Sequence, residues 1–458
     1  MKKFVQNLNK PLKGEITIPS DKSISHRAVI FSSLAKGKSV IKNFSKGQDP
    51  LSSLKICQNL GVQAEFVNDD LIINSSGRLI APTADLDCGN SGTTMRFMCG
   101  ILAGQNFNST LIGDESLSKR PMKRVIEPLT LMGAKIEGKD YKAPLKIYGQ
   151  NLHAIEYNSP LSSAQVKSCV LLAGMMCDGQ TTFTEPFLSR NHTELMLKYL
   201  GADIYTKNKI VKITKSTLQP KTIEIPGDIS SASFFIVAGL IVPNSEIILK
   251  NVGLNPTRTG ILEVVQKMGG NIEILDKKEV SGELVGDIKV SYSDLKSCTI
   301  EGEIIPKLID ELPVIAVLAT QAKGTTVVKD AQDLRNKESD RIKAVVCELK
   351  KIGADIEETP DGFIVNGKTE LGKISSHPTP QLCTQSHTAH SSPVRTSVPL
   401  GEGVCAIEVE SYHDHRLAMS LYIAGLICEK TIEINGFEWV NISFPEFESL
   451  FNNISDIY

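Results

Sequence analysis

The segment Pro19-Ser20-Asp21-Lys22-Ser23-Ile24-Ser25-His26-Arg27 runs without a break into the apolar residues Ala28-Val29-Ile30-Phe31. A polar, hydroxyl-rich start followed by an apolar run is typical of the N-terminus of a buried helix. Unpaired backbone N–H groups and the helix dipole favour an anion there, and Lys22 and Arg27 add full positive charges. Ser and Asp are also ordinary capping residues, so this segment alone is equally compatible with capping and no ligand.

The same pattern of polar start, apolar helix, turn and strand recurs along the chain. Its six starts lie near Ser23, Gly92, Ser163, Ser230, Asp310 and His415. We expect strands after these helices, at about residues 40–41, 109–112, 181–183, 246–249, 325–328 and 431–434. At intervals of about 70 residues a glycine ends a second helical run and suits a left-handed cap; these are Gly61, Gly133, Gly201, Gly269 and Gly353.

Six α/β units over 458 residues are more than one hydrophobic core supports, so we predict two domains of three units each. If three helix N-termini from each domain face a shared cleft, the cleft gathers N–H donors and positive dipole ends. A locally positive site then exists in a chain whose net charge is only −2. That net charge argues against nucleic acid as a partner.

Cysteine, histidine and hydropathy patterns exclude several other classes. The ten cysteines are spread singly with no C-x-x-C pair, which indicates reduced thiols. His192 and His413 lack partners at metal-ligand spacing, so we expect no metal and no cofactor. Because no apolar leader and no run of about 20 apolar residues is present, we expect a cytoplasmic protein without membrane contact.

Seven motifs, taken in chain order, identify a family. They are Lys22-Ser23-x-Ser25-His26-Arg27, Gly89-Asn90-Ser91-Gly92-Thr93-Thr94-Met95-Arg96, Arg120-Pro121-Met122, Ser163-Ala164-Gln165, Asp310-Glu311, Leu334-Arg335-Asn336-Lys337-Glu338-Ser339-Asp340-Arg341 and Asp414-His415-Arg416. Over about residues 10–450 the chain closely resembles the 5-enolpyruvylshikimate-3-phosphate synthases, or 3-phosphoshikimate 1-carboxyvinyltransferases. The resemblance implies an α/β fold of two inside-out α/β barrels, each made of three βαβαββ units. It implies one discontinuous domain of residues 1–19 and 227–458, a second of residues 20–226, and an active site in the cleft between them.

By resemblance, the enzyme transfers the enolpyruvyl group of phosphoenolpyruvate to the 5-hydroxyl of shikimate 3-phosphate and releases phosphate. The reaction belongs to the shikimate pathway to chorismate and the aromatic amino acids. The positions that match the family's phosphoenolpyruvate contacts are Lys22, Gly92, Arg120, Gln165, Arg341 and Arg416. Those that match its shikimate 3-phosphate contacts are Lys22, Ser23, Arg27, Ser163, Ala164, Gln165, Arg190 with the preceding Ser189, Asp310 and Lys337. Since cations come from both domains, we expect the substrate anions to draw the domains together.

The implied chemistry needs an acid and a base. Asp310 matches the family's base on the 5-hydroxyl, and Glu338 is the expected acid toward the methylene carbon, with Lys22 as the alternative. A glutamate needs a raised pKa to act as an acid, and the neighbouring Lys337 and Arg341 favour its charged form instead. The assignment of Glu338 is therefore weaker than that of Asp310.

Two regions depart from the commonest family pattern. Residues 375–403 are rich in Ser, Thr, Pro and His, including His377, His387 and His390, and predict a surface loop. Ile442 stands where many members carry a lysine, as in the family's second class, which Ser163-Ala164-Gln165 and Asn255-Pro256-Thr257-Arg258 also favour. Gly92 is the glycine of glyphosate-sensitive members, so we expect the site to have room for that inhibitor.

Two rival functions were weighed. The sister enzyme, UDP-N-acetylglucosamine enolpyruvyl transferase, carries Lys-Asn in place of Lys22-Ser23 and a loop cysteine where this chain has Glu115. A non-catalytic phosphosugar-binding protein is disfavoured because Asp310, Glu338 and the three arginines are all present. We expect the protein to act as a monomer.

Overall fold

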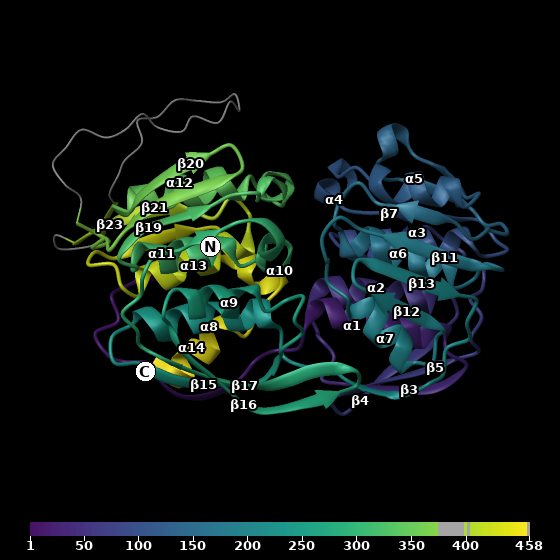
Figure 1. Ribbon diagram of the computed structural model, residues 1–458, viewed down its shortest axis with the longest axis horizontal. Coiled ribbons are helices and arrows are strands. Elements are labelled where there is room, and N and C mark those ends of the chain that lie inside the picture. The colour runs from purple at the N-terminus through teal and green to yellow at the C-terminus, as the bar shows by residue number, and fades with distance from the viewer. Residues whose placement is uncertain (374–397, 401–403, 456–458) are drawn as a thin grey trace.

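The computed structural model describes residues 1–373, 398–400 and 404–455 and consists of two lobes (Figure 1). We call residues 1–19 and 227–458 the first lobe and residues 20–226 the second lobe. One cluster of buried hydrophobic side chains lies in residues 5–18 and 229–454, and a separate cluster lies in residues 24–225. Each lobe thus has its own hydrophobic core, while the exact domain limits at residues 19/20 and 226/227 stay a prediction.

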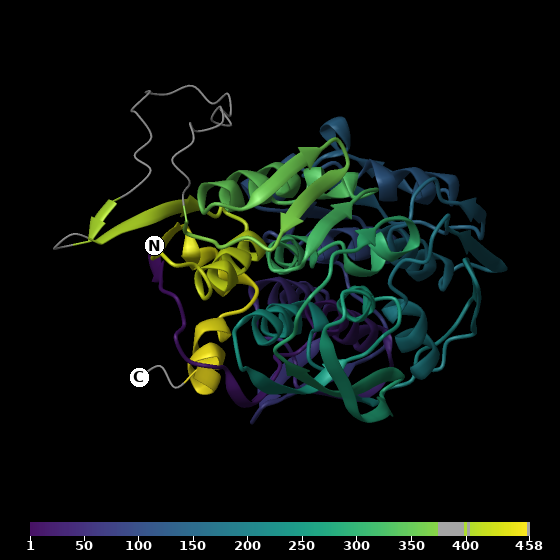
Figure 2. The same ribbon diagram turned by 60° about the vertical axis from the view of Figure 1, so that its left-hand side comes forward.

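Helices occupy the interior of each lobe and sheets its outside. In α11 (Leu312–Thr320) every residue is buried, and in α8 (Ile229–Ile241) all but Ser231 are buried. A helix that is apolar all round must be surrounded by protein. The strands alternate buried and partly exposed residues, as in β13 (Ile210–Thr214), because only one sheet face packs on these helices. This arrangement, visible from two directions in Figures 1 and 2, is the expected inside-out α/β fold.

Each lobe contains three β-α-β-α-β-β units. The second lobe is built from β14 (Thr222–Glu224), α1 (Lys22–Leu34), β3 (Gly37–Lys42), α2 (Gln48–Asn59), β4 (Gln63–Val67) and β5 (Asp70–Ser75); then β6 (Leu86–Asp87), α3 (Gly92–Ala103), β7 (Ser109–Ile112), α4 (Glu115–Lys119), α5 (Lys123–Leu131), β8 (Lys135–Glu137), η1 (Lys139–Tyr141) and β9 (Leu145–Tyr148); then β10 (Glu156–Asn158), α6 (Ala164–Gly174), β11 (Gln180–Thr184), α7 (His192–Tyr199), β12 (Ile204–Lys207) and β13. Numbered in chain order within a unit, the four strands lie in the sheet in the order first, second, fourth, third. The first pairs parallel with the second, the second pairs antiparallel with the fourth, and the fourth pairs antiparallel with the third.

The first lobe repeats this order, with two strands supplied by the N-terminal segment. Its elements are β2 (Lys13–Thr17), α8, β15 (Glu246–Gly253), α9 (Gly260–Lys267), β16 (Asn271–Val280) and β17 (Glu283–Ser291); then β18 (Thr299–Ile300), η2 (Gly302–Ile304), α10 (Ile305–Leu308), α11, β19 (Gly324–Val328), η3 (Gln332–Asn336), α12 (Arg341–Lys351), β20 (Asp355–Thr359) and β21 (Gly362–Gly367); then β22 (Val398–Leu400), β23 (Val404–Glu410), α13 (His415–Gly425), β24 (Ile432–Asn435), η4 (Phe437–Ile442), α14 (Phe447–Ser455) and β1 (Lys2–Val5). All six strands expected from the repeat are present, as β3, β7, β11, β15, β19 and β24.

The glycines at the ends of the second helices have the conformation that the repeat predicts. Their φ angles are +90° at Gly61, +94° at Gly133, +90° at Gly201, +77° at Gly269 and +94° at Gly353. These left-handed angles cost a glycine little and let the chain turn from the helix directly into a strand.

The sixth sheet differs from the other five. Strand β24 is parallel to β23, but its other neighbour is β1 from the N-terminus, and β22 pairs on the far edge of β23. The expected loop over residues 375–403 was therefore partly wrong, since residues 398–400 form a strand. The rest of that segment, including His377, His387 and His390, lies outside the described residues.

The lobes are joined by two chain crossings that lie side by side. Ser20 and Gly227 form an antiparallel bridge, the Asp21 N–H donates to the Pro226 carbonyl at 2.8 Å, and the Asp228 N–H donates to the Pro19 carbonyl at 2.8 Å. The hairpin of β16 and β17 also reaches from the first lobe to the second, along the lower edge of Figure 1. Among the described helices, none combines the length and apolarity that crossing a bilayer requires.

Candidate active site

Five of the six polar helix starts found in the sequence cap their helices with side chains, and α11, which follows Asp310, is the exception. Asp21 accepts from the Ile24 N–H at the start of α1, and Asp414 accepts from the N–H groups of Arg416 and Leu417 at the start of α13. Ser91 and Ser163 cap α3 and α6 in the same way. Capping is thus the role of Asp21, while Lys22 and Ser23 directly after it are left for other contacts.

Asp310 lies at the centre of a cationic cluster that spans both lobes. Its Oδ2 accepts from Arg190 Nη2 of the second lobe at 2.5 Å, and its Oδ1 accepts from Lys337 Nζ at 3.2 Å and Arg341 Nη1 at 3.3 Å. Burial by itself would raise the pKa of Asp310, but the surrounding cations, led by Lys337 and Arg190, hold the pKa well below its ordinary value. The carboxylate is therefore ionised.

Arg341 connects this cluster to two further carboxylates. Its Nε donates to Asp414 Oδ2 at 2.7 Å and its Nη2 to Glu338 Oε2 at 2.7 Å, and its side chain is 2 % exposed. Burial opposes the charge on Glu338, yet the positive charges around it, led by Arg341, together outweigh burial and lower the Glu338 pKa far below its ordinary value. Glu338 is thus ionised, as the sequence argument anticipated.

Lys22 has a partner that the sequence motifs did not indicate. Its Nζ donates to Asp49 Oδ2 at 3.0 Å, from the first turn of α2. Burial lowers the pKa of Lys22, but attraction and hydrogen bonding by Asp49 outweigh burial, and the pKa is raised. Lys22 is therefore protonated at neutral pH. The charges of Arg416 and Glu338 in the first lobe also act on it, so Lys22 faces the opposite lobe.

Gly92 lies against a layer of polar side chains in the second lobe. Arg96 Nη1 donates to Gln165 Oε1 at 2.8 Å, and Gln165 Nε2 donates to Thr93 Oγ1 at 2.9 Å. A Cβ added at Gly92 would lie 2.5 Å from Arg96 Nη1, so a larger residue fits only if this guanidinium moves. Gly92 thereby fixes the position of Arg96 and, through it, of Gln165.

The groups expected to meet shikimate 3-phosphate have clear partners in the second lobe. Arg27 donates from Nε to Thr193 Oγ1 at 2.7 Å, from Nη1 to the Ser23 carbonyl at 2.8 Å, and from Nη2 to Ser168 Oγ at 3.2 Å. All three of its nitrogens are thus engaged within that lobe. The turn before Arg190 is held by the buried Lys167, which donates to Glu185 and to the Ser189 carbonyl.

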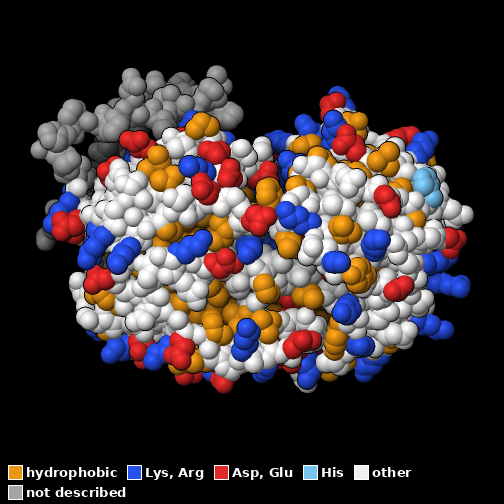
Figure 3. Space-filling view, viewed as in Figure 1, with side chains coloured by type: hydrophobic (Ala, Val, Ile, Leu, Met, Phe, Trp, Pro, Cys, Tyr) orange, Lys and Arg blue, Asp and Glu red, His pale blue; other side chains and the backbone are white. Residues whose placement is uncertain are grey.

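Two arginines of the site, Arg120 and Arg416, form no direct ion pair with a carboxylate of the described residues, although their charges act on carboxylates farther away. Within the described part of the chain, Arg120 donates only to neutral oxygens, Asn90 Oδ1 at 3.1 Å and Ser116 Oγ at 3.3 Å. Arg416 Nη1 contacts only the Asp310 carbonyl, at 3.4 Å. On the face in Figure 3, acidic and basic side chains of the two lobes meet along the line where the lobes join. An anion that enters between the lobes would find these two unpaired guanidinium groups.

The side chains that might have suggested a metal have other partners. His192 Nδ1 lies 2.7 Å from Glu283 Oε1, and His413 packs its ring on Trp439 at 4.8 Å. No cluster of three or more ligating side chains occurs in the described ranges. Among the described residues, six cysteines are buried free thiols: Cys57, Cys88, Cys99, Cys169, Cys177 and Cys428.

Known proteins resemble this chain over nearly its whole length. The family described as EPSP synthase (3-phosphoshikimate 1-carboxyvinyltransferase) matches residues 7–451. The 3-phosphoshikimate 1-carboxyvinyltransferase of Bacillus licheniformis is 48 % identical over 442 residues, which cover 95 % of this chain and 96 % of the relative. The chain belongs to the EPSP synthase family.

Solved structures of two enzymes have the same fold as this chain. The EPSP synthase of Acinetobacter baumannii superposes with a TM-score of 0.84 at 39 % identity, covering 99 % of this chain and 98 % of that one. The enolpyruvyl transferase NikO of Streptomyces tendae, at 14 % identity, has a TM-score of 0.74 over 98 % of this chain and 96 % of that chain, and so shares the fold.

The structure brings most of the EPSP synthase motifs of this chain together and adds residues that the motifs did not single out. Lys22, Arg190, Asp310, Lys337, Glu338, Arg341 and Arg416 form one interacting set across the lobes. Asp49, Arg96 and Asn90 are further members of the site, since each bonds a predicted residue. Arg96 and Asn90 lie inside a quoted motif and could have been found there, whereas Asp49 carries no local signal.

Proposed function

We propose that this chain binds shikimate 3-phosphate and phosphoenolpyruvate between its lobes and transfers the enolpyruvyl group to the 5-hydroxyl with release of phosphate. The observation that carries the proposal is the combination of ionised Asp310, protonated Lys22 and the unpaired Arg120 and Arg416 in one interlobe site. Family membership over residues 7–451 supports the same reaction.

The two substrates are assigned to different parts of the site. Phosphoenolpyruvate carries a carboxylate and a phosphate, and we assign it to Lys22, Gly92, Arg120, Gln165, Arg341 and Arg416. Shikimate 3-phosphate is assigned to Lys22, Ser23, Arg27, Ser163, Ala164, Gln165, Ser189, Arg190, Asp310 and Lys337. Planar guanidinium groups suit carboxylate and phosphate oxygens because they donate two parallel hydrogen bonds. Ser163 and Ala164 lie at the N-terminus of α6, where backbone N–H groups favour a phosphate.

Asp310 is the proposed base on the 5-hydroxyl. Its pKa is well below the ordinary value while Arg190 and Lys337 contact it, which makes it a weak base. A phosphate that binds Arg190 would compete for that guanidinium and so raise the pKa of Asp310. Substrate binding would thus prepare the base at the moment when the 5-hydroxyl arrives.

Lys22 has the proton that the methylene carbon needs. As the hydroxyl oxygen bonds to C2 of the enol phosphate, the methylene takes a proton and becomes a methyl group. Loss of phosphate and return of one methyl proton then regenerate the double bond. Glu338 is ionised by Arg341, so we propose Lys22 as the first donor and Glu338 as the alternative. Positive charge around the site would stabilise the departing phosphate.

The test measures phosphate release from phosphoenolpyruvate in the presence of one acceptor at a time. We expect turnover with shikimate 3-phosphate and none with UDP-N-acetylglucosamine. Turnover only with the UDP-sugar would show that the chain catalyses the rival reaction, which the named relatives do not favour. Binding of shikimate 3-phosphate without any phosphate release would support the non-catalytic alternative.

The remaining expectations concern assembly and location. All residues of the proposed site come from one chain, so we propose a functional monomer, which light scattering of the purified protein would check. Both substrates carry charged groups that do not cross a lipid bilayer readily, so we propose that the enzyme works in the cytoplasm.

A further inference from the structure

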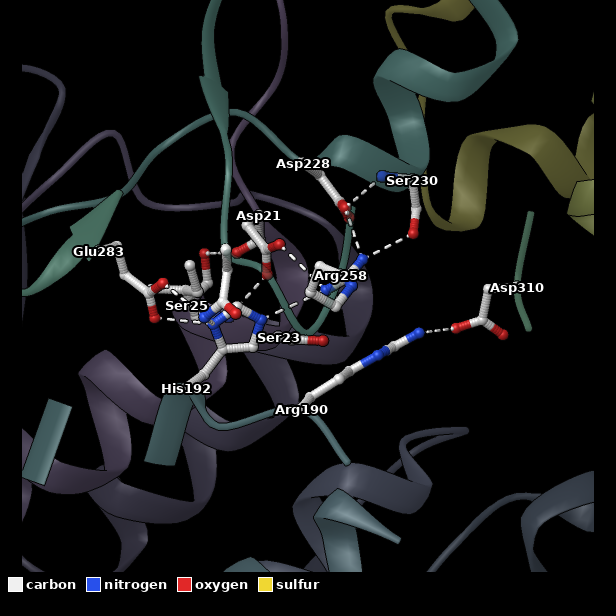
Figure 4. Close-up of polar contacts among 12 residues, drawn as sticks. Asp21, Ser23, Ser25, Arg190, His192, Asp228, Ser230, Arg258, Glu283 and Asp310 are labelled. Carbon is white, nitrogen blue, oxygen red and sulfur yellow. Dashed lines mark hydrogen bonds and ion pairs between the residues drawn. The ribbon is translucent and has the colours of Figure 1, made fainter. Parts of the chain in front are cut away.

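Arg258 is a buried cation at the junction of the two lobes. It lies between β15 and α9 of the first lobe, and its side chain is 2 % exposed. Figure 4 shows it pointing toward side chains that flank both chain crossings. A fully buried guanidinium is costly unless anions and hydrogen-bond acceptors surround it, so its partners indicate its role.

The contacts of Arg258 join the first turns of one helix from each lobe. Its Nη1 lies 3.3 Å from Oδ2 of Asp21, the cap of α1, and its Nη2 lies 3.1 Å from Oδ1 of Asp228, the cap of α8. Its Nη2 also donates to Ser230 Oγ at 2.6 Å. Both aspartates directly follow a crossing, so one planar side chain spans the place where the lobes are connected.

A second set of contacts ties the same loop to the turn that carries Arg190. Asn255 Nδ2 donates to Asn191 Oδ1 at 2.8 Å and to Glu283 Oε2 at 3.0 Å, and Glu283 also bonds His192. Asn191 and His192 directly follow Arg190 in the chain, and Glu283 lies at the start of β17 in the interlobe hairpin. The loop therefore contacts the segments on both sides of the proposed shikimate 3-phosphate site.

Electrostatics makes Arg258 necessary to this arrangement. Asp21 and Asp228 are both buried, and burial together with the charge of Asp228 raises the pKa of Asp21, while Arg258 opposes that rise. Without the guanidinium, two carboxylates would face each other in a poorly solvated space and would separate or take up a proton. Either change would shift the start of α1, which carries Lys22 and Ser23.

We propose that Arg258 is a positioning residue that fixes the relative orientation of the lobes at the crossing and, through Asp21, the place of Lys22 in the site. It does not touch substrate in this role. The inference rests on the proposed function for its kinetic readout only.

The expected effect follows from the population of the binding-competent arrangement. Replacing Arg258 with Met keeps the approximate length of the side chain but removes the charge and the two terminal nitrogens. A smaller fraction of molecules then has the two lobes in the binding-competent orientation. We expect the KM for shikimate 3-phosphate to rise about tenfold, with kcat lowered less than about threefold, because substrate that spans both lobes restores the arrangement at saturation. Arg258→Lys should recover only part of the loss, since one ammonium group replaces two separate nitrogens.

The experiment compares wild type, Arg258→Met, Arg258→Lys and Ser230→Ala with the control Glu348→Gln. Glu348 is also buried, but its partners Tyr412, Lys351 and Glu410 all lie in the first lobe. Each protein is assayed for KM and kcat, melting temperature, small-angle scattering with and without shikimate 3-phosphate, and hydrogen exchange over residues 19–23 and 226–230. We expect the control to lower only the melting temperature, and Ser230→Ala to raise KM by a smaller factor than Arg258→Met.

Folded Arg258 variants with the wild-type KM, scattering and exchange would overturn the inference. If Arg258→Met does not fold, Ser230→Ala supplies the decision, since it removes the hydroxyl that bonds Arg258 and Glu311 and keeps both charge pairs of Arg258. If wild type shows no turnover with shikimate 3-phosphate, the proposed function fails. The scattering and exchange of the unliganded variants still decide the role of Arg258 in that case.

Discussion

The two lobes each contribute an arginine to the site, and these two arginines differ in their partners. In the first lobe, Arg341 is buried and contacts three carboxylates, those of Asp310, Glu338 and Asp414. In the second lobe, Arg120 contacts only neutral oxygens among the residues that the structure describes. A cation with carboxylate partners stabilises the ionised form and the position of those acids. An unpaired cation is instead available to bind an incoming anion. Arg341 thus holds carboxylates in place, whereas Arg120 is left to meet an anion. The contrast belongs to these two arginines, since, within the described ranges, Arg416 of the first lobe is unpaired like Arg120, and Lys22 and Arg190 of the second lobe are paired like Arg341.

The most severe test removes the base at the centre of the first-lobe network. We expect Asp310→Asn to lower kcat by about 10²- to 10⁴-fold, the usual contribution of a general base. Steady-state phosphate release at saturating substrates measures it. Glu263→Gln, which loses a peripheral ion pair with Lys307, is the matched control and should keep the wild-type rate. A kcat for Asp310→Asn within threefold of wild type would remove Asp310 from the mechanism.

A second test asks whether Arg341 really supports its carboxylate neighbours. Arg341→Gln leaves Asp414 and Glu338 buried without their main cation, which typically costs about 3–5 kcal/mol. We expect the melting temperature to fall by about 3–5 °C in a protein of this size, together with loss of activity. An unchanged melting temperature would show that Arg341 does not stabilise the buried carboxylates.

The contrasting substitution is Arg120→Gln in the second lobe. Because Arg120 forms no direct ion pair in the described part of the chain and is only a minor contributor to the charge around Glu338, we expect a nearly unchanged melting temperature. We expect the KM for phosphoenolpyruvate to rise about 10- to 100-fold, the loss of a charge-assisted contact. Measuring KM and stability on the same samples tests both halves of the statement. Equal stability losses in the Arg120 and Arg341 variants would abolish the distinction between the two arginines.

Gly92→Ala probes the packing of the second lobe. The added methyl would displace Arg96, which lies 2.5 Å from the position of a Cβ. We expect the inhibition constant of glyphosate to rise by about tenfold, more than the KM for phosphoenolpyruvate, because overpacking typically costs 1–3 kcal/mol. Equal inhibition constants for wild type and variant would contradict this prediction.

The smallest effect is a pH dependence of stability in the second lobe. Burial lowers the pKa of His26 to about 3, so His26 is neutral in the fold and its stabilising effect is complete above the unfolded value near 6.5. As the pH falls from 6.5 toward 3, the unfolded chain gains a proton that the fold does not, at about 1.4 kcal/mol per pH unit.

His26→Asn should therefore flatten the fall in melting temperature between pH 6.5 and 4.5 by about 1.5 °C per pH unit. Asp310 and Glu338 of the first lobe have lowered pKa values and stay ionised in the folded protein across this window. Parallel curves for wild type and variant would exclude His26 as the source.

Local sequence determined the repeated elements of this protein. The helix start at Asp21 and the left-handed turns at Gly61 and Gly133 depend on the capping and backbone preferences of single residues, which act within one helical turn. The residues of the proposed site could also be predicted from the sequence, because they lie in short motifs at these helix starts. The strand at residues 398–400 was missed, since its Ser- and Pro-rich surroundings favour a loop.

Only the tertiary structure decided which of these groups became partners. The sequence contains 52 acidic residues, and nothing local distinguishes Asp49 as the partner of Lys22 or Asp21 as the partner of Arg258. Arg190 and Asp310 are 120 positions apart and meet because the lobes pack face to face. Backbone conformation is set by neighbours along the chain, whereas the strength of an ion pair depends on burial and distance, which exist only once the core has formed.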